Sequence, residues 1–236
     1  MKKVSRIIKI LTVAAAIIGM TLSFINAKAD GYSHWSTRLL YFTNQSNMWI
    51  AASALGLLIL DFSGAKKTEK IYRLFYSLKF VFTVSISLTA LIFFAVLAPG
   101  AANESYRAFS PWSITVHAIT PSLAIADFFI ERDDVVFSRK EVLYSVIPPL
   151  YYLFFSIVLY LLDVDFGRGD NFPYFFMNFG SPAGIFGSSG EFPYIIGSFY
   201  WMVFILLLVL GMSWLYFSLH PATRRARKRE KDSKKQ

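Results

Sequence analysis

The feature that most constrains this sequence is a series of six apolar stretches, each roughly as long as a membrane-spanning helix needs to be. They cover residues 7–26, 37–62, 76–98, 111–131, 142–162 and 195–218. Hydrocarbon offers no partners for backbone N–H and C=O groups, so such stretches are expected to be helices. The sequence therefore predicts an all-α, polytopic integral membrane protein. Its six transmembrane helices form one bundle, residues 1–218, and a basic cytoplasmic tail follows at 219–236.

Positive charges are distributed unevenly between these stretches. Cytoplasmic loops of membrane proteins are enriched in Lys and Arg. One alternate set of connections holds 20 of the 24 basic residues, and the other holds only Lys28, Arg38, Arg107 and Arg168. This asymmetry predicts that both termini face the cytoplasm. Eight basic residues follow Ala222, and we expect them to meet anionic lipid headgroups and not nucleic acid.

The first stretch has a second interpretation. Lysines at positions 2 and 3, an apolar core and the sequence Ala27-Lys28-Ala29 resemble a signal peptide with a small-x-small cleavage site. Cleavage would leave five spans. We favour retention, because the apolar core is long enough for a full span. A retained basic anchor and the basic tail suit a bacterial plasma membrane.

Compact motifs of soluble enzymes are absent from the sequence. There is no cysteine, which excludes disulfides, thiolate nucleophiles and zinc–thiolate sites. We find no H-E-x-x-H, Walker or dinucleotide motif, and residues 187–190 (GSSG) lack the spacing of a nucleophile elbow. His34, His117 and His220 are widely separated. The sequence therefore predicts neither a metal nor a cofactor.

His117 is the clearest polar residue at membrane depth, where ionisable side chains usually have a function. Ser110 and Pro111 suit the start of its helix. A rise of about 1.5 Å per residue then places the imidazole roughly 9 Å below the outer end of the span. Pro121 has no N–H for the carbonyl of residue 117, so we expect a bend with a free acceptor there. A histidine that only packs between helices would fit the same pattern.

Residues 41–47 (YFTNQSN) place several polar side chains where the second span begins. If that helix starts near Ser36 or Thr37, Thr43 also lies roughly 9 Å from its outer end. Asn47 follows at i+4 and shares the face of Thr43. The sequence therefore predicts that Thr43 and His117 lie at the same depth in the same leaflet.

A hydroxyl beside a neutral imidazole is the minimum for nucleophilic acyl transfer. Thr43 would attack a carbonyl, His117 would take its proton, and Asn44 or Asn47 would stabilise the oxyanion. Asp127 lies about 15 Å deeper than His117, and we interpret it as a charge at the inner interface beside Glu131 and Arg132. Alternatively, the polar residues at 41–47 cap a helix or hold a ligand.

Residues 41–47 together with His117, Pro121 and Asp127 resemble the androgen-induced protein family of six-span membrane proteins. That family includes the androgen-dependent regulator of tissue factor pathway inhibitor and bacterial relatives. Characterised animal members are threonine hydrolases that cleave fatty acid esters of hydroxy fatty acids, and their threonine and histidine match Thr43 and His117. The resemblance implies a hydrolase of lipid esters that needs no cofactor.

The outer connection 163–194 departs from the family pattern. It is rich in glycine and phenylalanine, and loops of this length are usually functional or disordered. Residues 172–177 (FPYFFM) are too apolar to stay in water, so we expect them to fold onto the bundle or into the interface. Two interpretations are open: an aromatic anchor at the headgroups, or a lid over a lipid-facing pocket. Two further functions stay open from the sequence: a non-catalytic lipid-binding or transport protein, and a scaffold whose basic tail recruits acidic partners.

Overall fold

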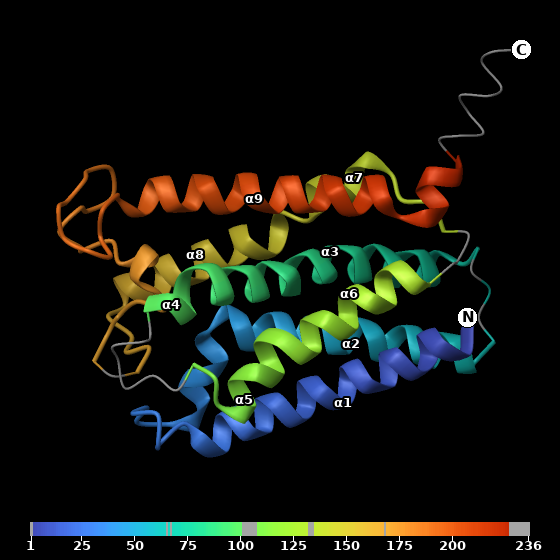
Figure 1. The fold of residues 1–236 in the computed structure, drawn as a ribbon, viewed down its shortest axis with the longest axis horizontal. Helices are drawn as coiled ribbons and strands as arrows, with labels where there is room; N and C mark the ends of the chain where they lie inside the picture. The colour runs from blue at the N-terminus through green and yellow to red at the C-terminus, as the bar shows by residue number, and fades with distance from the viewer. Residues whose placement is uncertain are drawn as a thin grey trace, which may run out of the picture.

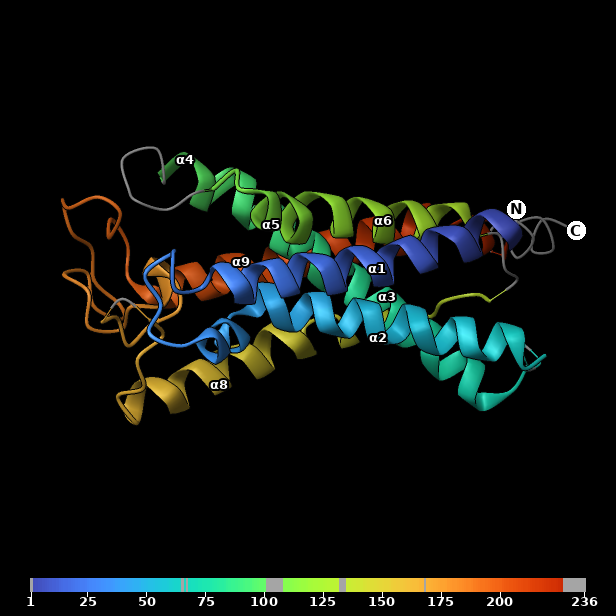
Figure 2. The ribbon, with the colours of Figure 1, turned by 90° about the horizontal axis from the view of Figure 1, so that it is seen from below.

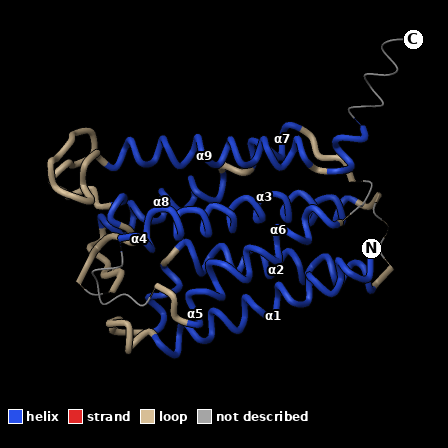
Figure 3. The backbone as a smooth tube through the Cα atoms, viewed as in Figure 1, coloured by secondary structure: helices blue, strands red, loops and turns tan. Residues whose placement is uncertain are grey.

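The computed structural model describes residues 2–64, 66, 68–100, 108–131, 135–167 and 169–226. Arg107, Arg132 and Arg168, and residues 227–236 of the predicted tail, lie outside these ranges. Within them the regular structure is helical, and Figure 3 shows no strand in the described parts of the chain. The predicted all-α fold is confirmed.

Six long helices follow the six predicted stretches. They are α1 (Lys2–Asn26), α2 (Phe42–Phe62), α3 (Lys70–Ile92), α6 (Thr120–Ile130), α8 (Ile147–Leu161) and α9 (Ser198–Leu219). Shorter elements adjoin them. These are η1 (Trp35–Leu40) before α2, η2 (Phe93–Leu97) and α4 (Ala98–Gly100) after α3, α5 (Pro111–Ile114) and η4 (Thr115–Ile119) before α6, α7 (Arg139–Tyr144) before α8, and η5 (Phe175–Met177) in the outer loop. η1 and η5 are 3₁₀ helices, whereas η2 and η4 are π-turns.

Five helical stretches in the described ranges are long and apolar enough to cross a membrane. They are Lys3–Asn26, Lys70–Leu97, Pro111–Ile130, Arg139–Leu161 and Ser198–Leu219. α2 has 21 residues, but the amides of Asn44, Gln45 and Asn47 lower its mean hydropathy. Outward faces carry exposed apolar side chains such as Leu207 and Phe154. This is the pattern of a helical membrane protein, in which lipid covers such faces.

The long helices lie side by side along the long axis of the molecule (Figure 1). α1 packs against α2 and α6, and α3 packs against α2, α6 and α9. Figure 2 shows α1 between α2 and α6. The start of α1 and the end of α9 lie at one end of the bundle, and the loop between α8 and α9 lies at the other (Figure 1).

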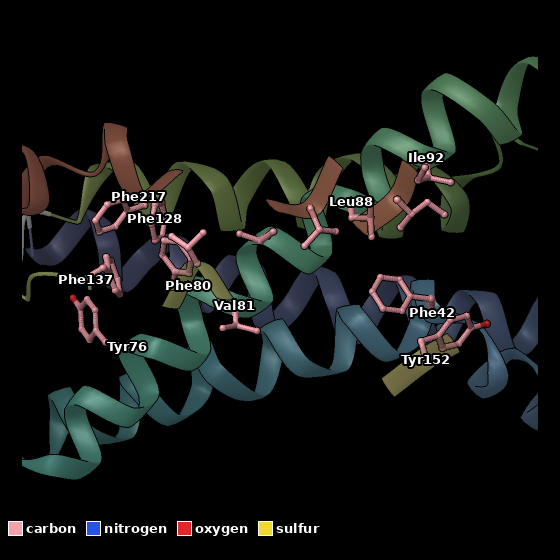
Figure 4. Packing of buried hydrophobic residues seen from close by; sticks show 14 of the residues in the cluster. Phe42, Tyr76, Phe80, Val81, Leu88, Ile92, Phe128, Phe137, Tyr152 and Phe217 are labelled. Atoms are coloured by element: carbon pink, nitrogen blue, oxygen red, sulfur yellow. The ribbon is translucent and has the colours of Figure 1, made fainter. Parts of the chain in front are cut away.

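Aromatic and aliphatic side chains fill the core along the bundle (Figure 4). Phe80, Phe128 and Phe137 pack closely near the end where the chain starts, with ring centroids 4.9 to 5.8 Å apart. Nearer the opposite end, Phe42 meets Tyr152 at 5.2 Å. Because rings contribute large buried areas, these contacts hold the helices that carry the site.

α2 begins later than the sequence suggested. Tyr41 has an extended backbone, with φ −85° and ψ 137°, and separates η1 from α2. Thr43 is therefore the second residue of α2 and not the sixth or seventh of a longer helix. The preceding residues turn as a 3₁₀ helix, which keeps the polar groups of residues 41–47 near other backbone carbonyls.

Two lysines and two carboxylates are buried together between α1, α3 and the end of α6. The Lys9 ammonium lies 2.7 Å from Glu131 and 3.4 Å from Asp127. Lys79 pairs with Asp127 at 2.5 Å and also with Glu131, and the Ser5 hydroxyl donates to Asp127 at 2.6 Å. We call these four charged residues the charge quartet.

The charge quartet corrects the interpretation of Asp127. Its side chain is 4% exposed, so it does not face headgroups or water; it lies beside Glu131, as expected, but inside the bundle. The reason is tertiary: cations from two other helices neutralise it, and only paired charges are tolerated at such burial. Lys9 and Lys79, which count among the inner basic residues, are likewise inside the bundle.

Candidate functional site

Thr43 and His117 are in contact across 74 residues of sequence. The Thr43 Oγ1 lies 3.3 Å from His117 Nε2. Thr43 is half-buried in the first turn of α2, and His117 is 3% exposed in η4. The sequence predicted that Thr43 and His117 lie at the same depth, and the structure places them in contact. It does so although α2 begins at Phe42 and not near Ser36.

The other edge of the imidazole faces Ser113, one turn earlier. His117 Nδ1 lies 2.9 Å from the Ser113 backbone carbonyl and 3.2 Å from its hydroxyl. A carbonyl only accepts hydrogen bonds, so Nδ1 carries the hydrogen and donates it. Nε2 is then unprotonated and accepts from the Thr43 hydroxyl. A backbone carbonyl thus fixes the tautomer, the task that a carboxylate performs in the familiar triads.

A π-turn shapes the helix around His117. The Thr120 N–H bonds the Thr115 carbonyl five residues back, so it is diverted from Val116, its partner in a regular helix. The next residue, Pro121, has no N–H to offer. The π-turn and Pro121 thus leave the Val116 carbonyl open, one residue before the carbonyl of residue 117 that the proline alone would free.

The Asn47 side chain donates a hydrogen bond to the open carbonyl of Val116. Its amide nitrogen donates to Val116 O at 3.1 Å and to Thr43 O at 2.8 Å. The Asn47 side chain is fully buried, and these two bonds use both of its amide hydrogens. Asn47 therefore joins the backbone at Thr43 to the backbone beside His117.

The other polar residues of 41–47 also bind protein groups. The Asn44 amide donates to Arg38 O at 2.8 Å, and the Gln45 amide donates to Leu39 O at 3.1 Å. The Ser46 hydroxyl pairs with the Thr89 hydroxyl of α3 at 2.8 Å. Gln45 therefore supplies a donor to the last turn of η1, and Ser46 connects α2 to α3.

Arg38 is buried near the site, against the rings of Tyr32 and Trp112. Its guanidinium lies over the rings of Tyr32 at 4.0 Å and Trp112 at 4.3 Å, and it pairs with Asp30 at 2.5 Å. Stacking and pairing together explain how an arginine can be only 4% exposed. The Trp112 ring in turn lies 6.5 Å from that of His117.

An apolar pocket begins at Thr43. About 530 Å³ of space free of protein atoms, part of it open to the surroundings, lies between α2, α3, η2, α8, η5 and α9. Its lining comprises Phe42, Thr43, Leu88, Thr89, Ile92, Leu97, Pro149, Tyr152, Leu153, Tyr174, Phe176, Met177, Met202 and Ile205. Thr43 thus stands with the pocket on one side and His117 on the other.

The long outer loop forms part of the pocket wall. Phe176 and Met177 are 5% and 3% exposed, and Tyr174 stacks on Phe176 at 5.1 Å. The loop is also tied to Tyr41, whose hydroxyl donates to Phe166 O at 2.9 Å. The expectation that residues 172–177 fold onto the bundle is confirmed. Tyr174, Phe176 and Met177 line a pocket, in keeping with one of the two alternatives from the sequence, but that this pocket carries Thr43 was not predicted.

Among the described residues, no three His, Asp or Glu side chains are grouped as a metal site. Compared with known proteins, the chain matches no family model, no curated protein and no solved structure. The function is therefore argued from the geometry of Thr43, His117 and the pocket.

Proposed function

We propose that this protein is an intramembrane hydrolase of lipid esters in which Thr43 is the nucleophile and His117 the general base. The observation that carries the proposal is the 3.3 Å contact between Thr43 Oγ1 and His117 Nε2 at the wall of an apolar pocket. A neutral imidazole that accepts from a hydroxyl is the arrangement that activates such a nucleophile.

The reaction proceeds through an acyl-enzyme. Thr43 Oγ1 attacks the ester carbonyl while His117 Nε2 takes the hydroxyl proton. Collapse of the tetrahedral intermediate breaks the bond to the alcohol, which leaves with the proton from His117. Water then attacks the acyl-Thr43 ester, His117 accepts a proton from that water, and the fatty acid is released as Thr43 recovers its proton. These steps need no metal or cofactor.

The pocket supports a lipid substrate. Its lining is mainly aliphatic and aromatic, with Thr43, Thr89, Tyr152 and Tyr174 as the polar members. An acyl chain in this space removes apolar surface from water and places its carboxyl end at Thr43. Fatty acid esters, including those of hydroxy fatty acids, fit this chemistry.

The oxyanion role falls to Asn44 more readily than to Asn47. Asn47 already donates both amide hydrogens to backbone carbonyls. Asn44 is adjacent to Thr43 and makes one described bond through its amide nitrogen, to Arg38 O. Its second amide hydrogen is the better donor to a developing oxyanion.

The proposal includes six spans, with α2 as the sixth and both termini in the cytoplasm of a bacterial plasma membrane. Two observations support it. The start of α1 and the end of α9 lie at the same end of the bundle (Figure 1), and the Lys and Arg residues concentrate in the connections assigned to that side. The basic tail would then meet anionic lipid headgroups.

Turnover of a long-chain fatty acid ester by the purified protein in detergent tests the proposal. We expect Thr43→Ala to abolish turnover and His117→Ala to lower it on the order of 10²-fold or more. Thr115→Ala is the matched control, because the Thr115 hydroxyl bonds only the Pro111 carbonyl in its own helix. Wild-type turnover in a folded Thr43→Ala or His117→Ala protein would contradict the mechanism.

The same pocket supports a second candidate function, reversible lipid binding without catalysis. A fluorophosphonate probe separates the two. Covalent labelling that disappears in Thr43→Ala supports the hydrolase. Saturable binding of a fatty acyl ligand, with neither labelling nor turnover, supports the binding protein.

A further inference from the structure

The imidazole of His117 lies flat against a phenyl ring from a neighbouring helix. Phe93 and His117 have ring centroids 3.8 Å apart and an interplanar angle of 11°. Phe93 is 1% exposed and His117 3% exposed, so water does not separate or solvate the pair. Aromatic pairs more often adopt edge-to-face or offset arrangements with centroids about 4.5 to 7 Å apart, so this parallel contact is unusually close.

Each ring belongs to a π-turn. Phe93 opens η2, where the Ala98 N–H reaches back to the Phe93 carbonyl, and His117 is the central residue of η4. A π-turn adds one residue to a helical turn and so rotates the side chains that follow it; such turns are frequent at functional sites. Two helices thus carry this uncommon turn at the level where their rings meet.

We propose that Phe93 is a positioning residue that holds the imidazole of His117 in the plane needed to accept the Thr43 proton. This inference rests on the proposed hydrolase function. Ser113 O holds Nδ1 and Thr43 Oγ1 approaches Nε2, so both edges of the ring are bonded. Neither bond alone prevents the imidazole from tilting. The phenyl ring of Phe93, with its centroid 3.8 Å away, prevents it, because a tilted imidazole would clash with the phenyl face.

The same contact stabilises the charged state that catalysis requires. When His117 takes the proton, the imidazole becomes a cation directly over the face of Phe93. Aromatic faces attract cations, and the attraction is strongest away from water. No carboxylate contacts His117 among the interactions described for it, so Phe93 and the Ser113 carbonyl together supply orientation and charge stabilisation.

The role of Phe93 is separate from substrate binding. Phe93 does not line the apolar pocket, whereas the nearby Ile92 and Leu97 do. Within the described parts of the chain, its other close ring contact is edge-to-face with Phe94, at 5.0 Å. Removing the phenyl face should thus change the chemical step and leave ester binding nearly unchanged.

Kinetics of Phe93→Leu give the first test. We expect kcat to fall by about 10- to 100-fold with KM nearly constant, since misplacing a catalytic group by about 1 Å can cost on the order of 10²-fold. Phe93→Tyr keeps the aromatic face and should retain most of the activity. Phe94→Leu is the matched control, because Phe94 is 47% exposed in the same π-turn and should behave as wild type.

A second measurement does not depend on turnover. Nitrogen-15 NMR of histidine-labelled protein reports which ring nitrogen carries the hydrogen, and the chain has only three histidines, so His117→Gln assigns the signal. We expect Nδ1–H in wild type and Phe93→Tyr. In Phe93→Leu the ring can tilt and lose its bond to Ser113 O, which fixes the tautomer, so we expect a mixture of tautomers. If Phe93→Leu does not fold, Phe93→Met fills similar space without a flat face.

The two measurements separate the two proposals. If the wild-type protein has no ester turnover but Phe93→Leu alters the His117 tautomer, the hydrolase is wrong and the positioning role stands for the pair. An unchanged tautomer together with unchanged kcat in Phe93→Leu overturns the positioning role and leaves the hydrolase in place. A rise in KM without a change in kcat would also overturn it.

Discussion

Asn47 and Val116 are joined by a hydrogen bond that spans 69 residues of sequence. The Asn47 amide nitrogen donates to the Val116 carbonyl at 3.1 Å, which the π-turn and Pro121 leave without a backbone partner. The same amide donates to Thr43 O. One side chain therefore fixes the distance between the helix that carries Thr43 and the turn that carries His117.

Removing the Asn47 amide is expected to destabilise the protein. Asn47→Leu removes the donor to Val116 O, whereas Thr43 O keeps the Ser46 hydroxyl as a donor. An unsatisfied buried polar group costs about 1 to 3 kcal/mol. Thermal unfolding in detergent should show a lower midpoint. Asn26→Leu is the control, because the Asn26 amide bonds only Leu22 O in its own helix. Equal midpoints for the two variants would contradict the bridging role.

The charge quartet predicts a rescue by a second substitution. Lys9→Met leaves two carboxylates facing one lysine, and breaking a buried ion pair costs about 3 to 5 kcal/mol. The double variant Lys9→Met with Asp127→Asn restores neutrality and should be more stable than Lys9→Met alone. Lys3→Met, at an exposed position of the same helix, should have little effect.

Detergent-solubilised protein and its unfolding midpoint measure this rescue. A double variant less stable than Lys9→Met would show that charge balance does not govern the cluster. The expected rescue would also show that α1 belongs to the folded bundle in solution, since Lys9 comes from α1 and Asp127 from α6.

A larger side chain in the pocket should lower the activity toward esters with long acyl chains. Met202→Trp enlarges a lining side chain, and each methylene kept out of the pocket loses about 0.8 kcal/mol of binding. We expect kcat/KM to fall for long-chain esters and to remain near wild type for an acetyl ester. Val203→Trp lies outside the lining and is the control. Equal loss on both substrates would mean that the variant damages the catalytic residues.

His220 predicts a loss of stability in mild acid. The pKa of His220 is lowered from 6.5 to about 4, chiefly by burial and also by the charges of Lys79 and Arg225, while Glu131 opposes them. Because the unfolded chain binds the proton more readily, stability is highest above about pH 6.5 and falls as the pH drops toward 4. His220→Leu should flatten this part of the profile. Parallel pH profiles for both proteins would exclude His220 as the source.

Helix positions and the pairing of Thr43 with His117 were accessible from the sequence. Apolar length located the helices because each long helix must be covered by lipid or by other helices. The prediction that Thr43 and His117 are close followed from their equal distance from the ends of their helices. It held even though α2 starts at Phe42 and not near Ser36. An error in the first residue of a helix changes little here, because the depth of a side chain depends on its position along the bundle.

Side-chain direction was not accessible in the same way. The two π-turns rotate the helices by part of a turn, so a regular helical period misplaces the side chains near Phe93 and His117. Sequence depth assigned Asp127 to the interface, yet its partners Lys9 and Lys79 come from helices far away in the chain.

The sequence by itself determined that this chain is all-helical and apolar enough for a membrane, because hydrocarbon permits few other backbone arrangements. It also determined which polar residues stand out. Only the tertiary structure decided what those residues contact. The reason is that a hydrogen bond or a ring stack depends on rotation about the helix axis and on neighbours that can lie more than 120 residues away in the chain, and local sequence encodes neither.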